Sequence, residues 1–306
     1  MMRRTGSASS LVGARHAAGQ ELSGPRAGGH GSDDPDPEAD TDPEMEAVTG
    51  PGSALPCMLA DGERHRMATE LLFDRIGVEA GWQVLDLGCG PLDVLAERVG
   101  SRGYVIGFDP DQELLTTARR VLAARGVRGV ELARGDFDAT GGASDSFDLV
   151  HARLLLGELA RPSATVSEMT RLTRPGGWVA VQDADLASWT CEPAVPAWDR
   201  LLDGLGRVWS GDPNMGRRLP QLLRAAGLVD VEVDVHAGVW PFDDPQRRLL
   251  PYLVSAHRRR ILAEEILTEA ELDTALAEVT EHLSRPDTLV MGWTLFQAWG
   301  RKPLDG

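Results

Sequence analysis

The stretch that most constrains this fold runs from Val84 to Leu92 and reads VLDLGCGPL. A short, nearly continuous apolar run of this kind is typical of a strand buried in a parallel sheet. The run ends at Gly88, and glycine permits a tight turn and lets a ligand approach the backbone. We therefore expect a strand, a glycine turn and then a helix whose N-terminus points at a ligand.

Apolar runs and helical segments alternate along the chain after this stretch. The alternation predicts an α/β fold, with a doubly wound, mostly parallel, seven-stranded, Rossmann-like sheet. The expected strands cover 83–87, 103–108, 130–133, 147–151, 177–182, 229–235 and 289–299, and the expected helices between the first five cover 92–99, 111–124 and 162–172.

Further helical segments predict a lid inserted into this sheet. They cover 194–208, 217–226, 245–266 and 269–283, which gives cap segments at about 190–226 and 244–286. Another helix is expected before the first strand, because Met67, Leu71, Leu72 and Ile76 recur at helical spacing. This helix either covers the mouth of the site or simply packs against the sheet.

Composition divides the 306 residues into a tail, 1–56, and a domain, 57–306. The tail has few aromatic or β-branched residues and is rich in Gly, Ser, Pro, Ala and acids, so we expect it to be disordered. Its acidic part, 33–46, is interpreted as a solvated tail or an over-extended start rather than a partner-binding arm.

The charge of the chain limits its partners. A net charge of -16 and a pI of about 4.8 argue against a basic nucleic-acid-binding surface. There is no apolar run of about 18 residues and no secretory signal, so we expect a cytoplasmic protein without a membrane partner. The three cysteines lie far apart and form no CxxC pair, which disfavours a structural metal site.

Carboxylates at the ends of the expected strands indicate a nucleotide. Asp109 follows Gly90 by about 20 residues, the separation of a carboxylate that binds ribose hydroxyls. Dinucleotide enzymes and methyltransferases share this feature. However, Asp93 stands where a dinucleotide fingerprint has its third glycine. Asp136 and Phe137 offer an acceptor and an aromatic face that suit an adenine ring.

Five segments in this order resemble class I S-adenosylmethionine-dependent methyltransferases. The resemblance is strongest to the branch that methylates small molecules in quinone and secondary-metabolite pathways. The segments are VLDLGCG at 84–90, IGFDP at 106–110, GDF at 135–137, FDLV at 147–150 and LTRPGG at 172–177.

The resemblance implies a cofactor site for S-adenosylmethionine. Gly88 and Gly90, with the small Cys89 between them, would let the methionine part of the cofactor approach the backbone. Asp86 would orient its ammonium group, directly or through water. Asp109 would hold the ribose hydroxyls, although it could also cap the helix that follows.

The remaining implied contacts lie further along the chain. Pro110 follows the ribose carboxylate, Asp136 would accept from the adenine amine, and Phe137 would either contact the ring or fill the core. His151 and Arg153, at the end of the fourth strand, would lie near the methionine part and the substrate. His151 is the best candidate catalytic base, and a histidine satisfied by hydrogen bonds is the alternative.

The acceptor side carries weaker signals. Related enzymes often have a histidine in the segment after the fourth strand, where this chain has Gly157 and Glu158. Asp183 and Asp185 could bind substrate or transfer protons, or form a solvated strand end. Aromatic residues of the C-terminal part predict an apolar substrate chamber or the core of the lid: Trp189, Trp198, Trp209, Trp240, Phe242, Tyr252, Trp293 and Trp299. The cluster 257–260, HRRR, is interpreted as a solvated helix face rather than an anion site.

The sequence therefore predicts methyl transfer from S-adenosylmethionine to a small, largely apolar metabolite at O, N or C. One alternative is a methyltransferase-like cyclase that binds the cofactor without methylating. Another is a non-catalytic protein that binds the cofactor and acts through a partner. A homodimer is compatible with each of these.

Overall fold

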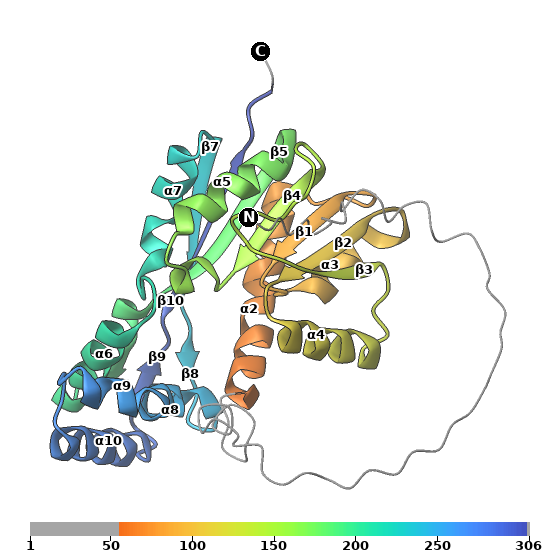
Figure 1. The fold of residues 1–306 in the computed structure, drawn as a ribbon. Coiled ribbons are helices and arrows are strands. Elements are labelled where there is room, and N and C mark those ends of the chain that lie inside the picture. Colours follow the sequence, from red (N-terminus) through yellow and green to blue (C-terminus); the bar gives the residue numbers. More distant parts are fainter. Residues whose placement is uncertain (1–54, 305–306) are drawn as a thin grey trace, which may run out of the picture.

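The computed structural model describes residues 55–304 (Figure 1). The expected disordered tail, 1–56, lies outside the described residues except for its last two positions. The structure has two parts that share one chain: a large mostly parallel sheet with helices on both faces, and a helical lobe beside one edge of that sheet (Figure 1).

The large sheet has seven strands in the order β3-β2-β1-β4-β5-β10-β7. The first five are parallel to one another, and β10 is antiparallel to both its neighbours. This confirms the predicted α/β fold. The strands are β1 (Gln83–Leu87), β2 (Tyr104–Asp109), β3 (Val130–Arg134), β4 (Phe147–Arg153), β5 (Thr173–Asp185), β7 (Val229–His236) and β10 (Thr294–Arg301).

Successive residues of a strand point to opposite faces of the sheet, so the side chains of these strands pack into two separate cores. Val84 and Val105 join the core under α2 (Leu55–Ile76) and α3 (Leu92–Val99). Leu85 and Ile106 join the core on the other face. Further helices of this part are α4 (Gln112–Ala124), beside β2 and β3, and α5 (Pro162–Leu172) and α7 (Leu219–Ala225), on the second core.

The lobe has its own core and a small antiparallel sheet of order β6-β9-β8. Four tryptophan rings fill this core edge to face: Trp189 lies 5.7 Å from Trp198, 5.4 Å from Trp240 and 5.0 Å from Trp293, centroid to centroid. These rings therefore pack on one another rather than line a chamber. The lobe contains β6 (Thr190–Glu192), α6 (Pro196–Val208), β8 (Val239–Trp240), α8 (Leu249–Ala256), α9 (Arg258–Ala263), α10 (Glu269–Leu283) and β9 (Leu289–Met291).

The segment 289–299 is not one strand, as predicted, but two. Its first part, β9, belongs to the lobe, and β10 belongs to the large sheet. The chain changes sheets at Gly292, where a Cβ atom would lie 2.5 Å from the ring of Trp240. A close crossing of this kind requires glycine, and the apolar pattern alone does not reveal it.

The helical predictions need three corrections. The segment 245–266 is divided into a short 3-10 turn, α8 and α9, and α8 ends at His257. The first cap segment also divides, since α6 lies in the lobe whereas α7 packs on β10, β7 and β5. In α2, Leu72 and Ile76 are buried as expected, but Met67 is 67% exposed.

The carboxyl ends of β1, β2, β4 and β5 lie at the edge of the large sheet that faces the lobe, because β5 leads directly into the lobe and these strands are parallel (Figure 1). This edge is where open parallel sheets bind their ligands. Within residues 55–304, no helix has both the length and the apolar composition that a membrane span requires.

Replacing Trp189 by alanine tests the packing of the lobe. Trp189 is 1% exposed and contacts three other indole rings, so Trp189→Ala should lower the free energy of unfolding by about 3–5 kcal/mol. Val239→Ala is the matched control in the same lobe, since Val239 is 50% exposed, and should cost about 0.5 kcal/mol. Equal losses in urea unfolding would contradict this view of the core.

Candidate functional site

The glycine turn after β1 is held from inside by the carboxylate that precedes it. Gly88 has φ +87° and Cys89 has φ +50°, both in the left-handed region. The amide of Gly90 donates a hydrogen bond to Oδ2 of Asp86 (2.6 Å), and the amide of Gly88 donates to the carbonyl of Phe108 (2.9 Å). The turn is therefore fixed to both β1 and β2.

A buried hydrogen-bond network lies directly beneath this turn. Nδ1 of His151 donates to Oδ1 of Asp86 (2.6 Å), and Nε2 of the same ring lies 3.0 Å from Oε1 of Gln182. The hydroxyl of Thr69, on α2, donates to that same amide oxygen (3.0 Å), and Arg153 donates to the hydroxyl (3.2 Å). The network joins α2, β1, β4 and β5 beneath the glycine turn.

This geometry changes the roles predicted for Asp86 and His151. Both side chains are fully buried, and both ring nitrogens of His151 are engaged. A general base must reach the proton that it removes, so the geometry does not support His151 as that base. Asp86 binds the backbone of the turn, and its fully buried side chain is not part of the wall of the cavity beside the turn, so its contact with a cofactor ammonium stays a prediction.

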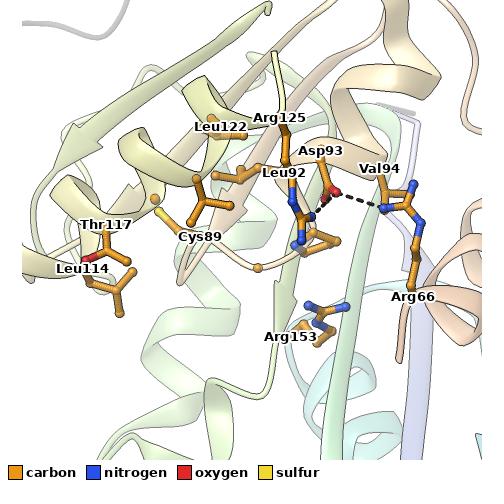
Figure 2. Close-up of a pocket in the computed structure, with 14 residues that line it drawn as sticks. Arg66, Cys89, Leu92, Asp93, Val94, Leu114, Thr117, Leu122, Arg125 and Arg153 are labelled. Carbon is orange, nitrogen blue, oxygen red and sulfur yellow. Dashed lines mark hydrogen bonds and ion pairs between the residues drawn. The ribbon is translucent and has the colours of Figure 1, made fainter. Parts of the chain in front are cut away.

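A cavity of about 260 Å³ opens beside the turn (Figure 2). Cys89, Gly90 and Arg153 line it, as do Leu114 and Thr117 from α4. Burial and the negative charges of nearby carboxylates raise the pKa of the Cys89 thiol. This environment disfavours the thiolate form of Cys89.

Two arginines hold Asp93 at the wall of the same cavity (Figure 2). Arg66 of α2 and Arg125 at the end of α4 lie 2.9 Å and 2.7 Å from its Oδ2. Burial acts to raise the pKa of Asp93, but the amide of Val94 and the two guanidinium groups outweigh it and lower the pKa. The residue that replaces the third glycine thus ties α2 and α4 to the first turn of α3.

A second cavity, of about 460 Å³, lies beyond the end of β2. Pro110, Asp136 and Phe137 line it, and a bridge between Asp136 and Ala139 makes their turn compact. The ring of Phe137 lies 6.4 Å from that of Phe108, so it contacts the core with one side. The structure therefore brings these three predicted residues together around one space.

Asp109 stands between the turn and this cavity. It is 5% exposed, and its Oδ1 accepts the amide of Asp111 (2.8 Å). Burial, with the charge of Asp111, raises the pKa of Asp109, although the Asp111 amide acts against it. The helix cap of α4 is Asp111 and not Asp109, because the Asp111 side chain accepts from Glu113 and Leu114.

Asp183 and Asp185 are buried at the end of β5 rather than solvated. Asp183 accepts the amides of Gly157 and Ala184 (2.9 Å each), and burial raises its pKa to about 7. Asp185 is paired with Arg217. Both carboxylates therefore hold neighbouring segments of the chain in place.

Sequence reasoning missed Thr69, Gln182 and Arg66. Thr69 and Gln182 contact each other across 113 positions of the chain, so no local spacing indicates this pair. One signal was available: Thr69 is a polar residue on the face of α2 that also carries Leu72 and Phe73.

Comparison with known proteins identifies the family. Residues 79–227 match the sequence model of a family described as a methyltransferase domain. This stretch, just under half of the chain, is therefore similar to a methyltransferase domain. The match agrees with the resemblance to S-adenosylmethionine-dependent enzymes seen in the sequence.

Relatives of known name agree with this domain. The chain is 30% identical over 176 residues to the uncharacterized methyltransferase C1B3.06c of Schizosaccharomyces pombe, over 54% of this chain and 63% of that protein. It is 29% identical over 188 residues to the demethylmenaquinone methyltransferase of Geobacillus stearothermophilus, over 56% of this chain and 80% of the relative. The match therefore spans less than two thirds of the first relative.

A solved structure supports the fold. The YcgJ protein of Bacillus subtilis has a TM-score of 0.53 to this chain at 15% sequence identity, over 79% of this chain and all of that structure. At this identity the likeness extends to the fold alone.

The residues around the glycine turn after β1 fit S-adenosylmethionine. Gly90 and Arg153 line the cavity beside the turn, and a Cβ atom on Gly90 would lie 3.5 Å from the side chain of Arg153. Asp109 and Asp136 supply acceptors for hydroxyl and amine groups, and Phe137 supplies an apolar face. These are the groups that a ribose and an adenine require.

Asp109→Ala tests the placement of the cofactor. Loss of one buried acceptor should weaken binding of S-adenosylhomocysteine by about 1–3 kcal/mol in calorimetry. Asp111→Ser is the control, because serine can keep the cap of α4 and lies two residues away. Unchanged affinity in Asp109→Ala would show that the ribose binds elsewhere.

His151→Leu tests the buried network. The change leaves Asp86 without its imidazole partner in a fully buried site, so the free energy of unfolding should fall by about 3–5 kcal/mol. Adding Asp86→Asn removes the buried charge and should restore part of the loss. Additive losses in this double-mutant cycle would contradict a direct coupling.

Proposed function

We propose that the protein transfers the methyl group of S-adenosylmethionine to a small, largely apolar acceptor. The observation that carries the proposal is the pair of cavities at the carboxyl edge of the sheet, one beside the glycine turn and one beyond Asp109. Together they offer space for the two ends of one extended cofactor.

Named residues account for each part of that cofactor. Gly88, Gly90 and Arg153 would hold the methionine part, Asp109 the ribose, and Asp136 with Phe137 the adenine. When bound, the cofactor supplies an electrophilic methyl group on a positively charged sulfur. The protein then has to align the acceptor and exclude water, which needs no elaborate catalytic motif.

The acceptor would bind between the turn and the lobe. The net charge of -16 disfavours a nucleic acid, and a relative at 29% identity is named demethylmenaquinone methyltransferase. We therefore place the acceptor among small aromatic or quinol-like molecules.

Incubation with methyl-labelled S-adenosylmethionine tests the proposal. We expect label in the organic phase when reduced demethylmenaquinone or a naphthol is present, and less label with Asp109→Ala than with the control Asp111→Ser. Binding of S-adenosylhomocysteine without methylation of any acceptor would favour the cyclase or the non-catalytic alternative. Failure to bind S-adenosylhomocysteine would refute the proposal.

A further inference from the structure

We propose that Glu158 and His257 flank the position of the methyl acceptor, and that Nε2 of His257 takes the proton of an acceptor hydroxyl during methyl transfer. The acceptor class is then a phenol or an enol. This inference rests on the proposed function and adds a second site, in which the large sheet supplies one wall and the lobe supplies the base.

The turn after β4 brings Glu158 close to the cofactor turn. The side chain of Leu155 lies 3.8 Å from the position that a Cβ atom on Gly88 would take. The next residues, Leu156–Glu158, form a short 3-10 turn, whose Gly157 amide is held by Asp183 (2.9 Å). Glu158 is exposed at the end of this turn.

A side chain at Gly157 would be crowded. A Cβ atom there would lie 3.0 Å from Oδ1 of Asp183 and 3.1 Å from the carbonyl of Asp212. A Cβ atom on Gly211 would in turn lie 2.3 Å from the Gly157 carbonyl oxygen. The chain that returns from the lobe therefore packs closely on this position, and we assign the base to another element.

The lobe brings His257 to the same turn through Trp209. The indole Nε1 of Trp209 donates to the carbonyl of Gly157 (3.2 Å), and the ring stacks on the imidazole of His257 with centroids 6.3 Å apart and planes 21° apart. His257 lies at the junction of α8 and α9, where the predicted continuous helix breaks. It is half-buried, so one side of the ring remains accessible.

The hydrogen bond of His257 leaves its outer nitrogen as an acceptor. Nδ1 lies 2.9 Å from the carbonyl oxygen of Leu253, which can only accept, so Nδ1 carries the hydrogen. In the neutral ring, Nε2 then has the free electron pair that a general base needs. The face of Trp209 also favours the cationic ring that forms when the base takes a proton.

Glu158 and His257 are close enough to interact electrostatically. Glu158 is exposed as a residue, but partial desolvation of its carboxyl group raises its pKa, and the charge of His257 acts to lower it. Among the described residues the two side chains form no direct ion pair, and His257 instead contacts Leu253 and Trp209. We place the acceptor hydroxyl at Nε2 of His257, beside Glu158.

The cluster 257–260 therefore divides into two kinds of residue. Arg258 pairs with Asp273 and Glu269, and Arg260 pairs with Glu264, so these arginines belong to a solvated face as predicted. His257 differs, because it turns toward Trp209 and the large sheet.

The proposed step is balanced. The acceptor oxygen forms a bond to the methyl carbon, the carbon–sulfur bond breaks and leaves its electron pair on sulfur, and the hydroxyl proton moves to Nε2 of His257. The imidazolium later releases this proton to water.

The first test needs no turnover. In full-length protein with labelled histidine and bound S-adenosylhomocysteine, nitrogen NMR should show the Nδ1–H form of His257. Adding 1-naphthol should shift the Nε2 signal, whereas 1-methoxynaphthalene, which has no hydroxyl proton, should not. An Nε2 signal that carries hydrogen in the neutral ring, or that does not respond to 1-naphthol, would overturn the inference.

The second test uses His257→Phe, which keeps a ring against Trp209 but removes both nitrogens. We expect a fall in kcat for hydroxylated acceptors of about 10²–10⁴-fold with unchanged binding of S-adenosylhomocysteine. Arg260→Gln is the control, because Arg260 lies three residues away in α9 and pairs with Glu264, and it should keep full turnover.

Failure of the inference can be told apart from failure of the proposed function. Full turnover by His257→Phe, or methylation of amines or thiols but of no hydroxylated acceptor, overturns the inference while methyl transfer stands. Loss of S-adenosylhomocysteine binding in the wild-type protein overturns the proposed function itself.

Discussion

The contact between Asp86 and His151 is the interaction on which the site depends. The two residues are paired positions of neighbouring strands, and both side chains are fully buried. A buried carboxylate is costly unless its oxygens are satisfied, and here one oxygen meets the imidazole while the other accepts the amide of Gly90. The electrostatic requirement of Asp86 thus fixes the shape of the glycine turn. Through Gln182 and Thr69 the same requirement fixes α2 above the sheet.

The large sheet and the lobe contribute different chemical groups to the site. The large sheet ends in backbone amides and carboxylates, which suit a polar cofactor with hydroxyl and amine groups. The lobe is built around four tryptophans, and it contributes an aromatic surface and an imidazole at the edge that faces the sheet. The two parts meet at Gly157, whose amide is held by the sheet and whose carbonyl accepts from Trp209 and from the amide of Asp212.

The sequence predicts those features that depend on neighbours in the chain. The strand before Gly88, the alternation of strands and helices, and the group Pro110, Asp136 and Phe137 all follow from local patterns. Contacts between distant segments could not be predicted in this way. The same apolar pattern in 289–299 serves two different sheets, and only the crossing of Gly292 over Trp240 separates them. His151 looked like a base because it ends a strand, but its partners come from β1, β5 and, through Thr69, from α2.

The sequence indicates little about the methyl acceptor, and this has a physical reason. A cofactor of constant shape requires constant groups at constant places, so its residues follow strand ends and glycine turns that a sequence shows. For methyl transfer, the residues around the acceptor need only align it and, where the acceptor is a hydroxyl, supply one base. Any element that reaches the turn can supply that base. Here Gly157 is closed by its neighbours, and the imidazole comes from a break between two lobe helices. Such a residue has no fixed spacing from the cofactor motifs, and only the fold brings it to them.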